Sequence, residues 1–218
     1  FEYMRWIAAV LDSHIQTHLN PDKLRITHLG GGACSLARYC ADVYPNSRNT
    51  VVELDAKLAE YVREWFDIPK SPRVKIRVGD AGTVTRSFAP ASRDVVIRDV
   101  FAVDKTPAEL TSVDFVRTVD HSLAPGGLYI LNCGDGPSLD GARAEVAALF
   151  EVFEQVCLVA DAAMLKGRRR GNIIIAASHS PLPAAGSAEA AAISRTLMGG
   201  GVPAQYRDSA QTRQFARL

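Results

Sequence analysis

From about residue 23 to residue 180, short runs of β-branched residues alternate with longer amphipathic stretches. This alternation is the feature that most constrains the fold. Short apolar runs between turn residues indicate strands, and apolar residues at three- and four-residue steps indicate helices. The predicted strands are 24–29, 49–54, 73–78, 94–100, 128–132, 152–160 and 172–178. The predicted helices between them are 35–43, 56–65, 107–123 and 141–150.

Strands that alternate with helices predict a parallel sheet with helices on both faces. The last two predicted strands are joined by a polar turn around residues 167–171, which predicts one antiparallel strand at the edge. The expected fold class is therefore α/β, with a Rossmann-like, seven-stranded, mostly parallel sheet and an antiparallel edge strand. A TIM barrel would need about 250 residues, and the chain has 218.

The same pattern divides the chain into three parts. Residues 1–22 are predicted to hold an amphipathic N-terminal helix, and residues 23–180 are predicted to form the Rossmann-like domain. Residues 181–218 are predicted to hold a Pro/Ala/Gly linker, a helix at 188–198 and a polar tail. Because the tail from residue 199 has few apolar side chains to bury, we expect partial disorder there.

Charge and hydropathy argue against several kinds of partner. The 25 Lys and Arg residues and 24 Asp and Glu residues leave a formal net charge of +1, whereas nucleic-acid-binding domains normally carry a clear basic excess. No apolar run approaches the roughly 20 residues that cross a bilayer, and no charged-then-apolar leader opens the chain. The four cysteines lack the spacing of a zinc site. We therefore expect a cytoplasmic protein with no nucleic-acid partner, no membrane partner and no metal site.

Three glycines, Gly30, Gly31 and Gly32, follow the first predicted strand. Glycines at a strand-to-helix turn allow a ligand to approach the backbone closely. The second predicted strand reaches Glu53, 23 residues after Gly30, and Asp55 follows shortly. A carboxylate at that strand end can accept hydrogen bonds from both hydroxyls of a ribose. This combination predicts a nucleoside-binding site.

A nicotinamide dinucleotide is the competing ligand, but the dinucleotide fingerprint would need a third glycine at Ser35. Two more acids fit a single nucleoside better. Asp80, followed by Ala81, ends the third predicted strand, where a carboxylate can accept from the amino group of an adenine. Asp99 lies in the fourth predicted strand. Ligands of open α/β sheets bind outside the carboxyl ends of the strands, so we expect Glu53, Asp80 and Asp99 to converge there.

From about Arg25 to Asn132, the chain resembles the spermidine synthase (polyamine aminopropyltransferase) family, within the class of S-adenosylmethionine-dependent methyltransferase folds. The matching motifs are the triple glycine with Arg38 soon after it, Glu53-Leu54-Asp55, Gly79-Asp80-Ala81, and the segments 94–99, 110–115 and 123–127. By this resemblance, Glu53 would bind the ribose, Asp80 the adenine, and Asp99 would help deprotonate the attacking amine. The resemblance also implies decarboxylated S-adenosylmethionine or S-adenosylmethionine as co-substrate, methylthioadenosine as a further ligand, a polyamine or other amine as acceptor, and a homodimer.

The chain also departs from this family. Ala33 replaces the Asp that holds the aminopropyl ammonium of the ligand, Ala102 replaces a second active-site Asp, and Tyr39 replaces a frequent Glu. Asp104 is an alternative acid if its loop bends. In this family a β-strand domain usually precedes the sheet. Here only the helix at 2–19 comes first, so either that domain is missing from the given sequence or the protein lacks it. Three functions stay open: aminopropyl transfer, methyl transfer from S-adenosylmethionine, and nucleoside binding without catalysis.

Overall fold

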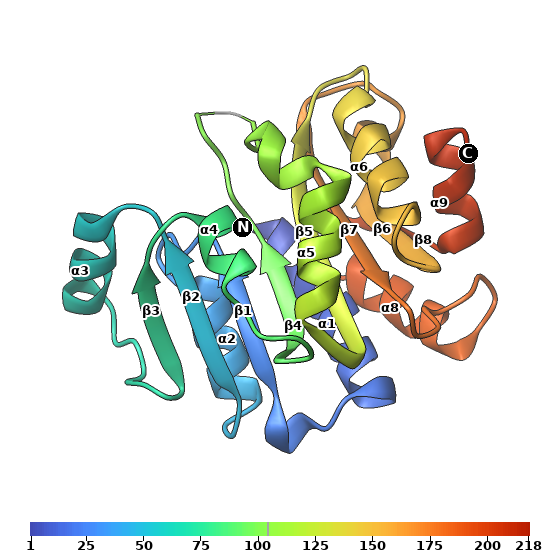
Figure 1. Ribbon diagram of the computed structural model, residues 1–218. Coiled ribbons are helices and arrows are strands. Elements are labelled where there is room, and N and C mark those ends of the chain that lie inside the picture. Colours follow the sequence, from blue (N-terminus) through green and yellow to red (C-terminus); the bar gives the residue numbers. More distant parts are fainter. Residues whose placement is uncertain (104) are drawn as a thin grey trace.

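One mixed sheet of eight strands runs through the molecule, with helices on both faces (Figure 1). This computed structural model describes residues 1–103 and 105–218, so Asp104 lies outside the described residues. The strands are β1 (Arg25–Leu29), β2 (Arg48–Glu53), β3 (Val74–Val78), β4 (Arg93–Arg98), β5 (Leu123–Asp135), β6 (Gln155–Asp161), β7 (Gly171–Ser178) and β8 (Ala204–Arg207). Their order across the sheet is β3-β2-β1-β4-β5-β7-β6-β8, and β3, β2, β1, β4 and β5 pair in parallel. The expected Rossmann-like α/β fold is confirmed.

The helices separate into two layers. One face of the sheet packs against α1 (Glu2–His18), α2 (Ser35–Val43), α3 (Ala56–Trp65) and α8 (Ala188–Met198). The other face packs against α4 (Ala81–Arg86), α5 (Val113–Ser122), α6 (Asp140–Phe150) and α9 (Ser209–Ala216), and Figure 1 shows α5 and α6 in front of the strands. The short helices η1 (Pro21–Lys23), η2 (Ala108–Thr111) and α7 (Ala162–Leu165) lie in connections. Because both faces are covered, consecutive residues of a central strand are buried, as Val95, Val96 and Ile97 are in β4.

The carboxyl half of the sheet differs from the prediction in strand number and position. The predicted seven strands are eight, and the edge strand is β8, which pairs antiparallel with β6. The antiparallel strand β7 lies inside the sheet, between β5 and β6. Its buried run of Ile173, Ile174 and Ile175 explains this place, because an interior strand must be apolar on both faces.

The expected disorder after residue 199 is wrong, since this segment forms β8 and α9. Ala204 and Phe215 are buried in the two main cores, on opposite faces of the sheet. Asp208 begins α9 with a capping box. Its side chain accepts from the backbone N–H of Gln211, and its own N–H donates to Oε1 of the Gln211 side chain. A few well-placed apolar and capping residues therefore order a polar segment.

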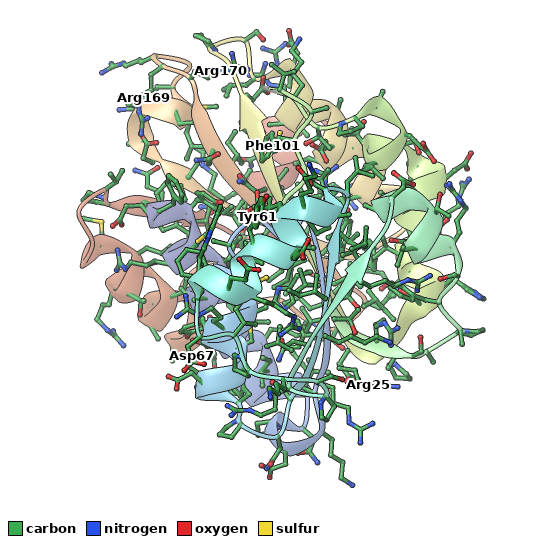
Figure 2. The ribbon with its side chains drawn as sticks, turned by 90° about the vertical axis from the view of Figure 1, so that its left-hand side faces the viewer. Arg25, Tyr61, Asp67, Phe101, Arg169 and Arg170 are labelled. Carbon is green, nitrogen blue, oxygen red and sulfur yellow. The ribbon has the colours of Figure 1, made fainter. Side chains whose placement is uncertain are left out.

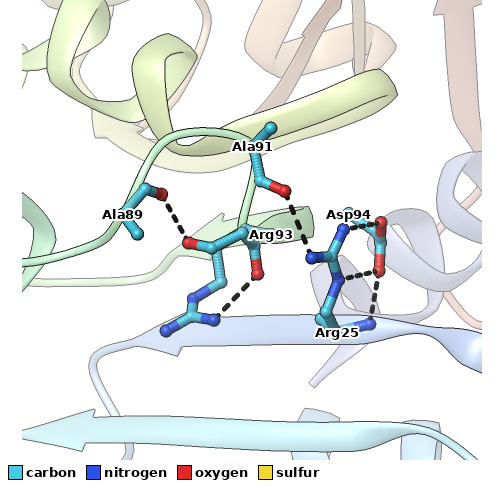
Figure 3. A network of polar contacts seen from close by, with 6 residues as sticks. Arg25, Ala89, Ala91, Arg93 and Asp94 are labelled. Atoms are coloured by element: carbon cyan, nitrogen blue, oxygen red, sulfur yellow. Dashed lines mark hydrogen bonds and ion pairs between the residues drawn. The ribbon is translucent and has the colours of Figure 1, made fainter.

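A polar network joins β1 to β4 at the amino-terminal ends of these strands (Figure 3). The Asp94 carboxylate accepts from the backbone N–H of Arg25 at 2.7 Å and from its guanidinium at 2.8 and 3.0 Å, and Arg25 also donates to the carbonyl of Ala91 at 3.1 Å. In Figure 2, Arg25 lies near the bottom and Phe101 near the top, where the parallel strands end. The network therefore lies at the opposite end of the strands from the carboxyl edge.

Within residues 1–103 and 105–218, every helix is too short or too polar to span a bilayer.

Candidate functional site

The loop of Gly30, Gly31 and Gly32 packs directly on the end of β4. Gly30 has a φ of +86°, and a Cβ there would lie 2.2 Å from the backbone oxygen of Asp99. At Gly31 a Cβ would lie 2.7 Å from the Val51 side chain. Only glycine fits this approach without a shift of the backbone or of Val51.

The Glu53 carboxylate, at the end of β2, binds this loop through hydrogen bonds. Its Oε2 accepts hydrogen bonds from the N–H groups of Gly31 and Gly32 at 3.0 Å each, and its Oε1 accepts from the N–H of Asp55 at 3.0 Å. Each carboxylate oxygen has two lone pairs, so Oε2 is fully used by the loop and Oε1 retains one lone pair for a ligand. The structure thus brings the glycines and Glu53 together, as expected from the sequence.

Asp55 and Asp80 each begin a helix at the same edge of the sheet. The Asp55 side chain accepts from the N–H groups of Lys57 and Leu58 at the start of α3, and Asp80 accepts from Thr83 at the start of α4. Hydrogen bonds from Thr83 lower the pKa of Asp80, so its carboxylate stays ionised. Both acids therefore have a capping role here in addition to any contact with a ligand.

Asp99 follows β4 directly and is held by two side chains from distant parts of the chain. The Tyr3 hydroxyl on α1 donates to Asp99 Oδ2 at 2.8 Å, and the Asn132 amide on β5 donates to Oδ1 at 2.9 Å. Burial and the neighbouring Asp99 carboxylate raise the pKa of Tyr3 above its usual range, which keeps the phenol a donor. Neither partner was predicted from the sequence. Asn132 had a detectable signal, because it is polar at the end of an apolar strand, but Tyr3 had none.

A first cavity, of about 360 Å³, opens at the carboxyl edge beside Glu53 and Asp80. We call it the acidic cavity because five of the described residues that line it are carboxylates. Its lining includes Glu53, Asp55, Asp80, Asp99 and Glu109, with Leu54, Ala81, Val100, Phe101, Pro107 and Leu110 among the apolar residues. This mixture of apolar walls and convergent acceptors suits a flat base and a ribose.

A second cavity, of about 210 Å³, lies between the glycine loop and α1. We call it the apolar cavity, since most of its lining is apolar. Its lining includes Phe1, Tyr3, Met4, His28, Ala33, Cys34, Val51, Ile97 and Asp99. Gly30, Gly32 and Asp99 line both cavities. Asp99 therefore stands where the two spaces meet.

The two alanines that replace family acids fall in different cavities. Ala33 lines the apolar cavity, and Ala102 lines the acidic cavity. The N–H of Ala102 donates to the carbonyl of Lys105 at 2.8 Å, which closes a narrow turn. Asp104, the alternative acid, lies outside the described part of the chain.

Arg98, one residue before Asp99, points to the opposite face of the sheet and is fully buried. Its guanidinium pairs with Glu145 on α6 and donates to the carbonyl of Leu110 at 2.7 Å. Burial raises the pKa of Glu145, while the Arg98 charge opposes this shift. Since Leu110 lines the acidic cavity, Arg98 holds a wall of that cavity in place.

No protein-family model matches the chain. Among solved structures, a "probable spermidine synthase" from Corynebacterium glutamicum is 61% identical with a TM-score of 0.97, covering 99% of this chain and 77% of that one. Human methyltransferase-like protein 13, solved in complex with S-adenosylhomocysteine, is 25% identical with a TM-score of 0.70, covering 92% of this chain and 94% of that one. Two kinds of transferase thus share the fold.

Curated relatives fall into the same two kinds. A mouse eEF1A lysine and N-terminal methyltransferase is 32% identical over 61% of this chain and 20% of its own length. A "probable polyamine aminopropyl transferase" of Bifidobacterium longum is 28% identical over 56% of this chain and 28% of its own length. The chain therefore spans about a fifth of the length of the first relative and just over a quarter of the second. Given the 61% identity with the solved relative, the chain belongs to the spermidine synthase-like family, with the class I S-adenosylmethionine-dependent methyltransferase fold.

Proposed function

We propose that this protein transfers an aminopropyl group from decarboxylated S-adenosylmethionine to an amine, with Asp99 as the base. The observation that carries the proposal is the place of Asp99, which lines both cavities and is oriented by Tyr3 and Asn132. A base for this transfer must lie within hydrogen-bond reach of the acceptor nitrogen, which itself lies against the donor carbon that it attacks.

The acidic cavity is the proposed place of the nucleoside. Oε1 of Glu53 would accept from a ribose hydroxyl, Asp80 would accept from the adenine amino group, and Gly79 and Ala81 would let the adenine approach the backbone. The carboxylates that line this cavity also favour a sulfonium and an ammonium over anions, because opposite charges attract more strongly where water is partly excluded.

The proposed chemistry places one demand on Asp99. The acceptor ammonium must lose a proton before its nitrogen can attack the carbon next to the sulfonium, and the Asp99 carboxylate takes that proton. As the new C–N bond forms, the C–S bond breaks, and its electron pair neutralises the sulfur of the departing methylthioadenosine. Asp99 then returns the proton to solvent, so charge and atoms balance. Tyr3 and Asn132 keep the carboxylate oriented throughout.

Methyl transfer from S-adenosylmethionine is the second candidate. Two observations favour it: the family acids are replaced by Ala33 and Ala102, and the curated relatives include methyltransferases at 32% identity. A ligand that keeps its carboxylate would avoid an additional acid at position 33 by charge repulsion, and this chain has none there. Non-catalytic binding gains no such support, because the cleft beside Glu53 and Asp80 is open.

Calorimetric titration and turnover assays test the proposal together. We expect methylthioadenosine and decarboxylated S-adenosylmethionine to bind, and amine acceptors such as putrescine or simple alkylamines to be aminopropylated. Asp99→Asn should lower kcat by about 10²- to 10⁴-fold, the usual contribution of a general base, and leave methylthioadenosine affinity within a few fold. Asp114→Asn, an exposed carboxylate on α5, is the matched control and should change neither value.

The outcomes separate the candidates. Turnover of S-adenosylmethionine with a methylated product, and none with the decarboxylated form, would replace aminopropyl transfer by methyl transfer. Binding without any turnover would leave nucleoside binding alone. Failure of all three nucleosides to bind would reject the site itself.

A further inference from the structure

The connection from β6 to β7 carries the densest cluster of positive charge in the sequence. Lys166, Arg168, Arg169 and Arg170 fall within five residues, and residues 162–170 contain no acid. All four residues are exposed. We call residues 166–170 the basic turn. The proposed reaction has not yet used it, although the net charge of the whole chain is only +1.

The pairing of the strands places the basic turn at the carboxyl edge of the sheet, where the acidic cavity opens. Gly171, the first residue of β7, pairs with Asp135, the last residue of β5, and β6 runs antiparallel to β7. The connection from β6 to β7 therefore lies at the end of the sheet where β5 and its parallel neighbour β4 end. Figure 2 shows Arg169 and Arg170 at the same end of the molecule as Phe101.

Phe101 links this turn to the wall of the acidic cavity. Its ring packs against the backbone of Gly134 in β5, because a Cβ at Gly134 would lie 2.8 Å from the ring atom Cε1. Gly134 pairs with Asn172 of β7, which is two residues from Arg170. Since Phe101 also lines the acidic cavity, the basic turn begins about two strand spacings from the cavity wall.

Hydrogen bonds and close packing hold the basic turn in a defined shape. One carboxylate oxygen of Asp161 caps α7, and the other accepts from the Arg169 guanidinium at 2.6 Å. Gly167 has a φ of +64°, and a Cβ there would lie 2.5 Å from the carbonyl oxygen of Pro137. The turn therefore packs on the segment that follows β5, and Arg169 is used within the turn itself.

Lys166 and Arg168 are the cations that remain for a partner. Among the described residues, no acid forms an ion pair with either side chain. Asp135, which pairs with the first residue of β7, already accepts from the N–H groups of Gly136 and Ala142 at 2.7 and 2.8 Å. The turn is thus complementary to an anion that the described part of the chain does not supply.

Charges of opposite sign therefore lie at one edge of the sheet, with carboxylates in the acidic cavity and cations on the basic turn. The carboxylates attract a small diamine and the basic turn repels it. A nucleic acid would be repelled by the carboxylates and would need a larger basic surface. An acceptor that carries its amine and its acidic groups some distance apart satisfies both charges.

The sheet geometry gives that distance. Asn132, whose amide bonds Asp99, pairs with Ile174, four residues from Arg170. Four residues along a strand span about 13 Å, and the two steps from β4 through β5 to β7 span about 10 Å. The straight distance from Asp99 to the basic turn is therefore roughly 15 Å, which an extended polypeptide covers in about four or five residues.

We propose that the acceptor is an amine carried by an acidic polypeptide, which places the amine at Asp99 and acidic side chains about four residues away on the basic turn. Lys166 and Arg168 bind these carboxylates, and Phe101 lies on the path between the two ends. The inference rests on the proposed function, because it places the amine of this acceptor at Asp99.

The experiment uses three synthetic peptides with blocked ends and a single lysine. The first carries three glutamates after a four-residue Gly/Ser spacer, the second has glutamines in place of the glutamates, and the third has the glutamates directly next to the lysine. Each is assayed as acceptor with decarboxylated S-adenosylmethionine and with S-adenosylmethionine. We expect the first peptide to have a KM about tenfold below the other two and a kcat within about twofold of theirs, because two or three exposed ion pairs act on binding.

A double variant tests the basic turn directly. Lys166→Gln with Arg168→Gln should raise the KM of the first peptide by about three- to tenfold and leave the second peptide and putrescine within about twofold. Both substitutions keep Arg169, so the turn keeps its bond to Asp161. Raising the salt concentration from about 50 mM to about 500 mM should remove the preference of the wild-type protein in the same way.

Lys23→Gln with Arg48→Gln is the matched control. Both residues are exposed and lie at the amino-terminal ends of β1 and β2, at the opposite edge of the sheet. This variant removes the same charge as the double variant of the basic turn, so it should leave every KM within about twofold.

A second readout needs no turnover. Fluorescence anisotropy in the presence of methylthioadenosine should show tighter binding of the labelled first peptide than of the second, and the double variant of the basic turn should remove this difference. A single-stranded RNA oligonucleotide is the competing polyanion and should bind more weakly than the first peptide.

Five results would overturn the inference: an equal KM for the first two peptides, an equal KM with and without the spacer, a preference that survives in the double variant, tighter binding of the RNA, or no turnover of any peptide where putrescine reacts. If putrescine is turned over through Asp99 and the peptides show no preference, only this inference falls. If no nucleoside binds, the proposed function falls, and the anisotropy of the two peptides alone decides whether the basic turn binds acidic side chains.

Discussion

The contact between Gly30 and the backbone of Asp99 couples the glycine loop to the proposed base. The loop packs on the backbone carbonyl of Asp99, so a side chain at Gly30 would displace either the loop or Asp99. Gly32 differs, since its φ of +47° is unusual for a side-chain-bearing residue but a Cβ there would meet no atom within 4 Å. Substitutions at the two glycines therefore distinguish the cost of steric overlap from the cost of backbone strain.

Gly30→Ala should lower the free energy of unfolding by about 3 kcal/mol, because backbone strain and steric overlap add. Gly32→Ala should cost about 1 kcal/mol, the penalty of the left-handed conformation alone. Urea denaturation measures both values, and calorimetry with methylthioadenosine should show the larger loss of affinity for Gly30→Ala. Equal effects of the two substitutions would contradict the role of the contact with Asp99.

The site residues at strand ends could be predicted from the sequence. The site residues that come from other elements could not. Glu53, Asp80 and Asp99 lie at the carboxyl edge because parallel strands end there together. Tyr3 approaches from a helix 96 residues earlier than Asp99. The tautomer of the buried His28 depends on the orientation of Asn49, which only the hydrogen bonds around Asn49 reveal.

The strands β1 and β4 adjoin each other in the sheet although their sequences are separated by two other strands. The Arg25–Asp94 network joins them at the end opposite the cavities. Its fork of two guanidinium bonds, together with a backbone N–H, makes it stronger than an isolated surface pair.

Asp94→Ala should therefore lower the free energy of unfolding by about 1–2 kcal/mol, since it leaves the Arg25 backbone N–H without its acceptor. Arg117→Ala, which removes an exposed pair with Asp114, should change it by less than about 0.5 kcal/mol. Chemical denaturation gives both values. Affinity for methylthioadenosine should stay constant in both variants, and a large loss in Asp94→Ala would show that the two ends of the strands are coupled.

Elements with strong periodicity and clear caps match the prediction. The helices at 35–43, 56–65 and 188–198 have the predicted bounds, and Asp55 and Ser187 cap the latter two. The predicted helix at 107–123 instead divides at Ser112, whose hydroxyl caps α5 after a short 3₁₀ turn. The short elements α4 and β8 have too few residues to show a hydrophobic period. Their secondary structure therefore depends on the elements against which they pack.

The molecule as a whole buries two histidines that titrate far from their usual range. Burial lowers the pKa of His14 and of His28 to about 4. Their pKa in the unfolded chain is about 6.5, so between these values the unfolded chain binds more protons than the folded one. Stability should thus fall as the pH drops from about 6.5 to about 4, by up to roughly 1.4 kcal/mol per pH unit for each residue.

His179 acts in the opposite direction. Partial burial lowers its pKa, but hydrogen bonds to Glu154 and Asp120 outweigh this and raise it overall. Its contribution is therefore present at low pH and is lost as the pH rises through the raised pKa. Urea unfolding at several values between pH 4 and 7.5 should show a shallower acid slope for His14→Gln than for the wild-type protein. Parallel curves would mean that His14 is not buried in its neutral form.

The shared lining of the two cavities has a consequence for how selectivity could change. Among the described residues, only Gly30, Gly32 and Asp99 line both cavities, and every other lining residue belongs to one of them. Substitutions in separate compartments that spare these three should act independently, so their free-energy effects on binding should add. Binding of the adenine and binding of the rest of the donor molecule could then change in separate steps, each tolerated on its own. One fold would thus have a gradual route between aminopropyl donors and methyl donors.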